Sequence, residues 1–230
     1  MNIASQIAGH VVGLLLDVLV VDGLRRGPYR RYPFLFLYVI GDFLTTVLEI
    51  EPSLTFNATA AAQQRWRATY WIDEQIMQGL LFLLVISLLY RASAGTRARR
   101  TILLGVIGAT VLFATISLAV HHRPGMKTGQ WMTPWTRDLN SSSAVLDLGL
   151  WALLIRSREK DYRLLMVSGA LGIQFAAGAM GQALREISRA TVPATGLFIM
   201  FANLACTYIW WQAFRPSKTP KNVYTKNRAA

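Results

Sequence analysis

Seven apolar runs follow one another along this chain, each roughly 18 to 24 residues long, the length that an α-helix needs to cross the ~30 Å hydrocarbon core of a bilayer. Hydrophobic residues make up 53% of the chain and charged residues only 16%, a balance that excludes an ordinary soluble domain. The sequence therefore predicts an all-α, polytopic membrane protein with seven transmembrane helices. The helices are expected at about 4–24, 33–51, 69–91, 101–121, 139–156, 162–185 and 193–214.

The expected domain organisation is one bundle and one tail. Residues 1–214 should form the seven-helix transmembrane bundle, and residues 215–230 a basic cytoplasmic tail. The first apolar run follows an uncharged start and precedes four arginines instead of a small-residue cleavage site. We therefore expect this run to be retained as a helix and not removed as a signal peptide.

The Lys and Arg residues predict the orientation in the membrane. Of the 24 in the chain, 17 lie in the segments that follow the first, third, fifth and seventh runs, and 7 lie in the others. Because loops rich in positive charge stay in the cytoplasm, the N-terminus should be outside and the C-terminus cytoplasmic. The net charge of +12 is concentrated in connections between apolar runs, so we expect no nucleic-acid partner.

The stretch Thr69–Arg91 combines a polar start with an apolar remainder. Asp73, Glu74 and two glutamines precede an apolar segment, so its polar end must face protein, water or headgroups and not lipid tails. Glu74 and Gln78 are four residues apart and share a helix face. We expect this third helix to lie near the centre of the bundle.

Further carboxylates occur within the apolar runs. Asp17 lies in the first run, Asp42 in the second and Asp147 in the fifth, and no Lys or Arg lies at matching depth. Carboxylates inside a bilayer are costly and mark ion paths, counter-charges for ligands or interhelical hydrogen bonds. The residue types alone leave these three alternatives open.

The sixth and seventh runs add amides and small residues. Ser168, Gly172 and Ala176 repeat every four residues, and Gly178 and Gln182 form a separate pair four residues apart, spacings that permit close helix contact. Gln174, Gln182 and Asn203 are candidates for a ligand site. The pattern fits a tightly packed helix or partner interface joined by amides, and it also fits a ligand cradle.

The expected outer loop, residues 122–138, contains Trp131 and Trp135, which we expect to act as interfacial anchors. The three histidines, His10, His121 and His122, all belong to the outer side. With a nearby carboxylate they offer metal-ligand types, but nothing in their spacing requires a metal. We expect no metal and no cofactor.

Several activities are excluded by missing residues. The seventh run has no lysine for a retinal Schiff base, and the sequence contains no phosphate-binding loop, zinc-protease motif or nucleophile elbow. The single cysteine, Cys206, cannot form an intramolecular disulfide.

A faint internal repeat relates the first three runs to the last three. Leu16-Asp17 corresponds to Leu146-Asp147, and Tyr32 to Tyr162, at a shift of 130 residues. Parallel repeats around a central helix occur in small-solute carriers whose site lies between the repeats. Similar helix lengths also produce such matches by chance.

Two pairs of neighbouring runs resemble a group of seven-helix membrane proteins common in acidobacterial genomes. The strings are FLFLYVIGDF with YWIDEQIMQGLLFLLVISLLYRA, and SGALGIQFAAGAMGQALR with NLACTYIWWQAF. The resemblance covers most of the chain and implies the same topology. The group has no assigned activity, so the resemblance implies no mechanism.

For function, we expect a non-enzymatic protein of the bacterial inner membrane, either receptor-like or an accessory subunit, because no catalytic motif or output domain is recognised. It would bind a small ligand, a lipid, another membrane protein or a second copy of itself through its outer half and the sixth helix. The alternative is a small-solute carrier in which Asp17, Asp42 and Asp147 line the translocation path.

Overall fold

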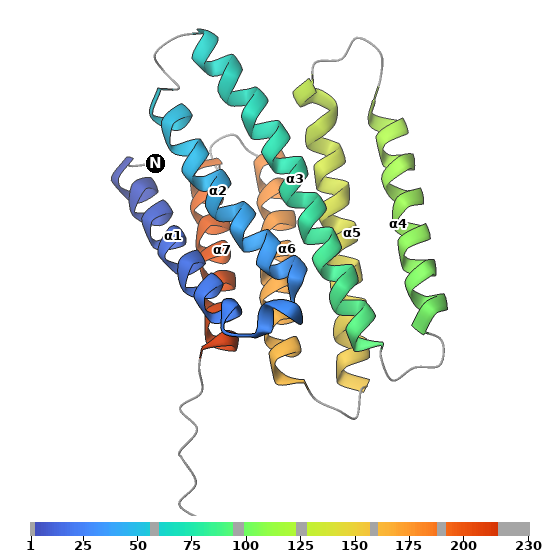
Figure 1. Cartoon of the computed structure of the whole chain (residues 1–230). Helices are drawn as coiled ribbons and strands as arrows, with labels where there is room; N and C mark the ends of the chain where they lie inside the picture. The colour runs from blue at the N-terminus through green and yellow to red at the C-terminus, as the bar shows by residue number, and fades with distance from the viewer. Residues whose placement is uncertain are drawn as a thin grey trace, which may run out of the picture.

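The structure, a computed structural model, describes residues 3–55, 60–93, 99–122, 128–156, 161–187 and 192–215, which are almost wholly helical. These ranges contain seven α-helices, whose arrangement is drawn in Figure 1. They are α1 (Ile3–Arg25), α2 (Pro33–Thr55), α3 (Ala60–Ala92), α4 (Arg99–His121), α5 (Thr128–Arg156), α6 (Tyr162–Ile187) and α7 (Val192–Phe214). A short 3-10 helix, η1 (Pro28–Arg30), joins α1 to α2. The all-α prediction is confirmed, and the expected tail beyond Arg215 lies outside the described residues.

Five helices in the described ranges are long and apolar enough to cross a membrane. These spans are Ile7–Arg25, Asp73–Ala92, Leu103–His121, Tyr162–Gly181 and Ala194–Phe214. Large apolar side chains such as Leu104, Val111 and Val120 of α4 lie on the surface, where lipid covers them at no cost. The chain is therefore a membrane protein by the length and composition of its helices. In α2 the apolar stretch Pro33–Leu48 is shorter, and the first half of α5 is polar.

Two helices begin earlier than their apolar runs. Helix α3 begins at Ala60, nine residues before the expected start, because residues 60–68 are rich in Ala, Gln and Arg, which favour a helix without adding hydropathy. Helix α5 begins at Thr128, so the expected loop 122–138 is wrong from residue 128 onward. Hydropathy marks where a helix is apolar and not where it begins.

The early part of α5 is attached to α4 by polar contacts. The Ser117 hydroxyl donates to the Asp138 carboxylate at 2.7 Å, and the Trp135 indole donates to the Ala114 carbonyl at 3.3 Å. The Trp131 and Trp135 rings lie 6.0 Å apart, and the His122 ring lies 5.3 Å from Trp131. The two tryptophans expected in a loop therefore lie on the first turns of α5 and pack toward α4.

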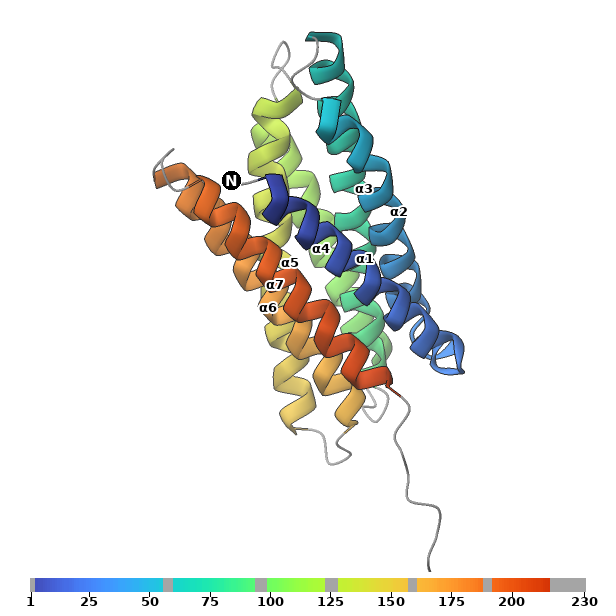
Figure 2. The ribbon, with the colours of Figure 1, turned by 90° about the vertical axis from the view of Figure 1, so that its left-hand side faces the viewer.

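Six helices form a closed ring in the order α1, α2, α3, α5, α6, α7, and α4 lies outside it against α5 and α3. Figures 1 and 2 show the seven helices running roughly along one direction. Helix α3 contacts α2, α4, α5 and α6, the largest set of helix neighbours in the described structure, in line with its expected central position. Within the ring, α1 packs against α7 and α3 against α5, so the chain closes on itself.

The hydrophobic core lies toward one end of the bundle, here called the core end, where α1, α3, α5 and α7 finish and α2 and α6 begin. Its fully buried side chains include Leu24, Leu35, Leu88, Leu171 and Trp210. The opposite end, where α1 begins, is called the cavity end. In Figure 1, α1 leans away from α7 toward the cavity end.

Tyr32 is the main contact that closes the core end. Its ring lies edge-on to Phe214 at 5.2 Å, and the Arg91 guanidinium lies 4.5 Å above it while donating to the Arg31 carbonyl. Burial raises the pKa of the Tyr32 phenol, and the Asp161 carboxylate raises it further against the effect of Arg91. The phenol therefore stays neutral at physiological pH, and the ring joins the start of α2 to the ends of α3 and α7.

Gly23 allows the closest approach of α1 to α7. A Cβ at this position would lie 3.2 Å from both the backbone oxygen and the Cβ of Phe214. We expect Gly23→Leu to lower the free energy of unfolding by about 1–3 kcal/mol, because the added side chain must push two packed helices apart. Reversible unfolding in mixed micelles, followed by tryptophan fluorescence, measures the effect.

The matched control is Gly108→Leu on α4, where a Cβ would meet nothing within 4 Å. This variant should unfold like the parent protein. An equal loss of stability in both variants would show that the close contact between α1 and α7 is not the cause.

Candidate functional site

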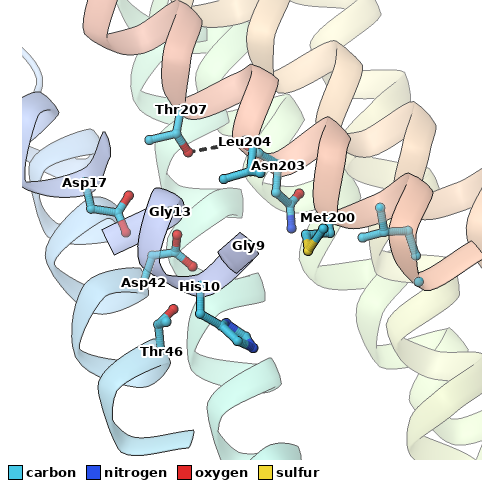
Figure 3. A pocket seen from close by; sticks show the side chains of 12 residues that line it. Gly9, His10, Gly13, Asp17, Asp42, Thr46, Met200, Asn203, Leu204 and Thr207 are labelled. Atoms are coloured by element: carbon cyan, nitrogen blue, oxygen red, sulfur yellow. Dashed lines mark hydrogen bonds between the residues drawn. The ribbon is translucent and has the colours of Figure 1, made fainter. Parts of the chain in front are cut away.

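A cavity of about 270 Å³ lies between α1, α2 and α7 and reaches from the cavity end toward the middle of the bundle. It exists partly because Gly13 and Gly196 contribute no side chains to its wall, whereas the end of the Met200 side chain occupies the space beside Gly9. Figure 3 shows the carboxylates of Asp17 and Asp42 on one side, facing Asn203 and Met200 on the other. The other lining residues are His10, Thr46, Ile199, Leu204 and Thr207.

Asp17 and Asp42 are the acidic side chains of this cavity. The side chain of Asp17 is only 3% exposed, and the two carboxylates are close enough to interact electrostatically. Within the described part of the chain, neither carboxylate accepts a hydrogen bond or forms an ion pair. Two acidic groups within apolar helices, with no partner among the described residues, are costly, and such groups commonly serve as counter-charges for a ligand or ion.

The remaining polar groups of the cavity come from three helices. Asn203 of α7, His10 of α1 and Thr46 of α2 direct an amide, an imidazole and a hydroxyl to its wall. The Thr207 hydroxyl donates to the Asn203 carbonyl at 3.0 Å and so remains bonded to its own helix. The cavity thus offers hydrogen-bonding groups on several sides and an acidic patch on one.

Sequence analysis identified Asp17, Asp42 and Asn203 as candidates and did not assign His10, Thr46 or Thr207 to this site. The sequence contains a pattern that places these residues on common helix faces. Gly9, Gly13 and Asp17 are each four residues apart on α1. Asp42 and Thr46 repeat the same spacing on α2, as do Asn203 and Thr207 on α7.

Gln174 lies in a different polar group, between α2, α6 and α7. Its amide donates to the Tyr38 hydroxyl at 2.8 Å, and its amide oxygen accepts from the Cys206 thiol at 3.4 Å. The Tyr38 ring packs edge-on against Trp210 at 5.6 Å, and the Trp210 indole donates to the Val167 carbonyl at 3.2 Å. These bonds join three helices across the ring and leave Gln174 with partners on both ends of its amide.

Asp147 is also partnered. It is 2% exposed, and the Ser168 hydroxyl of α6 donates to it at 2.9 Å. Gly172 lies against the same carboxylate, since a Cβ there would be 3.0 Å from the second oxygen. Ser168 and Gly172 therefore permit close packing of α6 on α5, while Ala176 is exposed and a Cβ at Gly178 would meet nothing within 4 Å.

The polar start of α3 contributes no residue to the cavity lining, but Asp73 is close enough to Asp42 to interact with it electrostatically. Gln75 donates to the Thr136 hydroxyl of α5 at 3.1 Å. Asp73 and Glu74 are half-buried, and Gln78 is 5% exposed. One oxygen of Asp73 and the amide nitrogen of Gln78 are buried without a hydrogen-bond partner among the described residues. The side chain of Gln182, the remaining predicted residue, lies outside the described part.

Side chains that could ligate a metal do not cluster among the described residues. No group of three His, Cys, Asp or Glu side chains lies close enough there to hold a metal ion. His10 faces the cavity, whereas His121 is on α4 near Asp138 at 3.7 Å. The predicted site residues therefore fall into four separate places, and only Asp17, Asp42 and Asn203 share the cavity.

Comparisons with protein-family models, with curated proteins and with solved structures found no match to this chain. The resemblance to seven-helix proteins of acidobacterial genomes remains a prediction from sequence. Function must therefore be argued from the cavity and its chemistry.

The hydrogen bond between Gln174 and Tyr38 is expected to stabilise the bundle. In a double-mutant cycle with Gln174→Leu and Tyr38→Phe, we expect a coupling free energy of about 0.6–1.7 kcal/mol, the range for interhelical hydrogen bonds in membranes. Unfolding in mixed micelles gives the four stabilities. The control pair is Gln174→Leu with Ser168→Ala, whose bonds have no shared partner, and its coupling should be near zero. Equal coupling in both cycles contradicts the assignment.

Proposed function

We propose that this protein is a receptor-like, non-enzymatic membrane protein that binds a small polar solute in the cavity between α1, α2 and α7. It crosses the bacterial inner membrane seven times, with the cavity end outside and the core end in the cytoplasm. The observation that carries the proposal is a cavity of about 270 Å³ whose two carboxylates have no partner among the described residues. Concave sites with a few convergent polar groups are the usual form of small-molecule sites.

The packing of α5 supports seven crossings. Its polar side chains Thr136, Ser143 and Asp147 are all buried against protein, so they need not face lipid. Helix α2 lies between α1 and α3 in the ring, and its apolar stretch is extended by a further turn or more of helix. Both helices lie alongside the five that are long and apolar enough to span.

The charge distribution supports the orientation. The connections at the core end, together with the basic tail, carry 17 of the 24 Lys and Arg residues of the sequence, and the cytoplasmic side of a membrane protein carries this excess. The cavity then belongs to the outer half. Because Tyr32, Arg91 and Phe214 close the core end, the cavity is suited to receive a solute from outside.

A small-solute carrier is the second candidate, favoured by the arrangement of the two halves. The ring pairs α1 with α2, α2 with α3 and α1 with α7, and it pairs α5 with α6, α6 with α7 and α5 with α3 in the same pattern. Asp17 and Asp147 occupy equivalent helices at a shift of 130 residues, and both are buried. Carriers built from parallel repeats bind their solute between the repeats.

The orientation is tested by labelling single cysteines in spheroplasts, in a Cys206→Ala background. Tyr29 at the core end and His122 at the cavity end are both exposed. We expect a membrane-impermeant maleimide to label His122→Cys in intact spheroplasts and Tyr29→Cys only after permeabilisation. The reverse pattern would place the cavity end in the cytoplasm.

The site itself is tested by filling the cavity. A Cβ at Gly13 would meet Leu204 at an ordinary 3.7 Å, so a phenylalanine fits on the helix while its ring occupies the cavity. We expect native mass spectrometry of protein extracted from its own membranes to show a retained small molecule that Gly13→Phe loses. Gly108→Phe, on the lipid face of α4, should retain it.

Two outcomes contradict the proposal in this experiment. Retention by Gly13→Phe places the molecule elsewhere, and the absence of any retained molecule in the parent protein removes the evidence for a receptor. Flux of the retained molecule through proteoliposomes, absent in Gly13→Phe, would select the carrier.

A further inference from the structure

We propose that the occupant of the cavity is a small organic ammonium ion, held between the carboxylates of Asp17 and Asp42 with its apolar body against α7. This inference rests on the proposed function and specifies its ligand class. It is drawn from the charge, the size and the two-sided lining of the cavity.

The lining of the cavity is acidic on one side. Asp17 and Asp42 come from adjacent helices and meet at one wall, and no lining residue is Lys or Arg. Asp17 is 3% exposed and points into the cavity without a hydrogen-bond donor from the described residues. A cation that enters supplies both the missing donor and the missing counter-charge, and charge-assisted hydrogen bonds are the strong ones.

The volume of the cavity favours an organic cation over a metal ion. An apolar cavity of about 150 Å³ holds benzene, so 270 Å³ has room for about ten non-hydrogen atoms. A bare cation would leave most of this space unfilled, and calcium would also need about six to eight oxygen ligands. No group of three acidic, His or Cys side chains exists among the described residues to supply them.

The opposite wall explains where the body of such a ligand would lie. Met200 and Leu204 of α7 present a thioether and an aliphatic group across from the carboxylates. A methionine sulfur makes favourable contacts with aromatic rings. Asn203 lies on the same helix and offers a neutral donor and acceptor. The cavity thus has one acidic pole and one largely apolar pole, which match an ammonium group attached to a compact hydrocarbon body.

The test compares three probes of nearly equal shape and different charge. Phenethylammonium, phenethyl alcohol and phenylacetate are titrated calorimetrically into the full-length protein in nanodiscs of zwitterionic lipid, with empty nanodiscs as the baseline. We expect the ammonium to bind about tenfold or more tightly than the alcohol, because it alone makes charge-assisted bonds to both carboxylates. The carboxylate should not bind.

Variants of the cavity residues test whether the ammonium binds in the cavity. Asp17→Asn and Asp42→Asn should each weaken ammonium binding about tenfold or more, and Gly13→Phe should abolish it. Asp42→Glu keeps the charge and should keep the preference for the ammonium. The matched control is Asp22→Asn on the same α1, an exposed residue paired with Arg26, which should bind like the parent protein. Circular dichroism and gel filtration confirm folding, and Asp42→Asn stands in if Asp17→Asn does not fold.

The failure of this inference is distinguishable from that of the proposed function. Binding of the alcohol or the carboxylate as tight as that of the ammonium, lost in Gly13→Phe, would keep a solute site and overturn the charge assignment. No ammonium binding at millimolar concentration, or binding unchanged in both Asp→Asn variants, overturns it as well. Displacement of the ammonium by equimolar sodium would identify a metal cation instead.

Discussion

The arrangement of the whole bundle depends on how closely α1 and α7 approach at the core end. There Gly23 lies against the backbone of Phe214, with no side chain between the helices. Toward the cavity end, the neighbours of Gly13 and Gly9 are instead the ends of the long Leu204 and Met200 side chains. Two helices in close backbone contact at one end and separated by side chains at the other must diverge. The divergence leaves a space that glycines do not fill, so the same contact closes the core and opens the cavity.

The buried polar groups of the described structure are of two kinds, those with a protein partner and those without one. In the absence of water, a polar group inside a membrane protein is stabilised by a protein partner or by something bound. Asp147 has Ser168, and Gln174 has Tyr38 and Cys206. Asp17 and Asp42 have no such partner in the described structure and line a space large enough for a solute. The difference lies in the neighbours, since all these residues look alike as polar residues in apolar runs.

This difference also explains what the sequence could and could not predict. Apolar runs predicted the helices, because burial in lipid requires length and hydropathy and little else. They missed the true starts of α3 and α5. Residues 60–68 of α3 favour a helix without adding hydropathy, and the polar start of α5 is attached to the bundle by tertiary contacts such as that of Trp135 with α4. Asp17, Asp42 and Asn203 were identified as candidates by their cost in a bilayer. Their meeting in one cavity depends on the ring order of the helices, and a single sequence does not contain that information.

The predicted internal repeat bears on the choice between the two proposed functions. Asp17, Val20 and Leu24 form a buried stripe on α1, and Asp147, Leu150 and Leu154 form the equivalent stripe on α5. At the same shift of 130 residues, the counterpart of Asp42 on α2 is Gly172 on α6.

Gly172 brings α6 so close that a Cβ would lie 3.0 Å from the Asp147 carboxylate, and Ser168 donates to that carboxylate at 2.9 Å. One half of the repeat therefore uses its aspartate to bind the neighbouring helix, whereas the other half holds two carboxylates beside a cavity. A carrier that exposes its site alternately gains from two halves that can exchange roles. The unequal use of equivalent aspartates instead favours a site that stays on one side of the membrane, as a receptor requires.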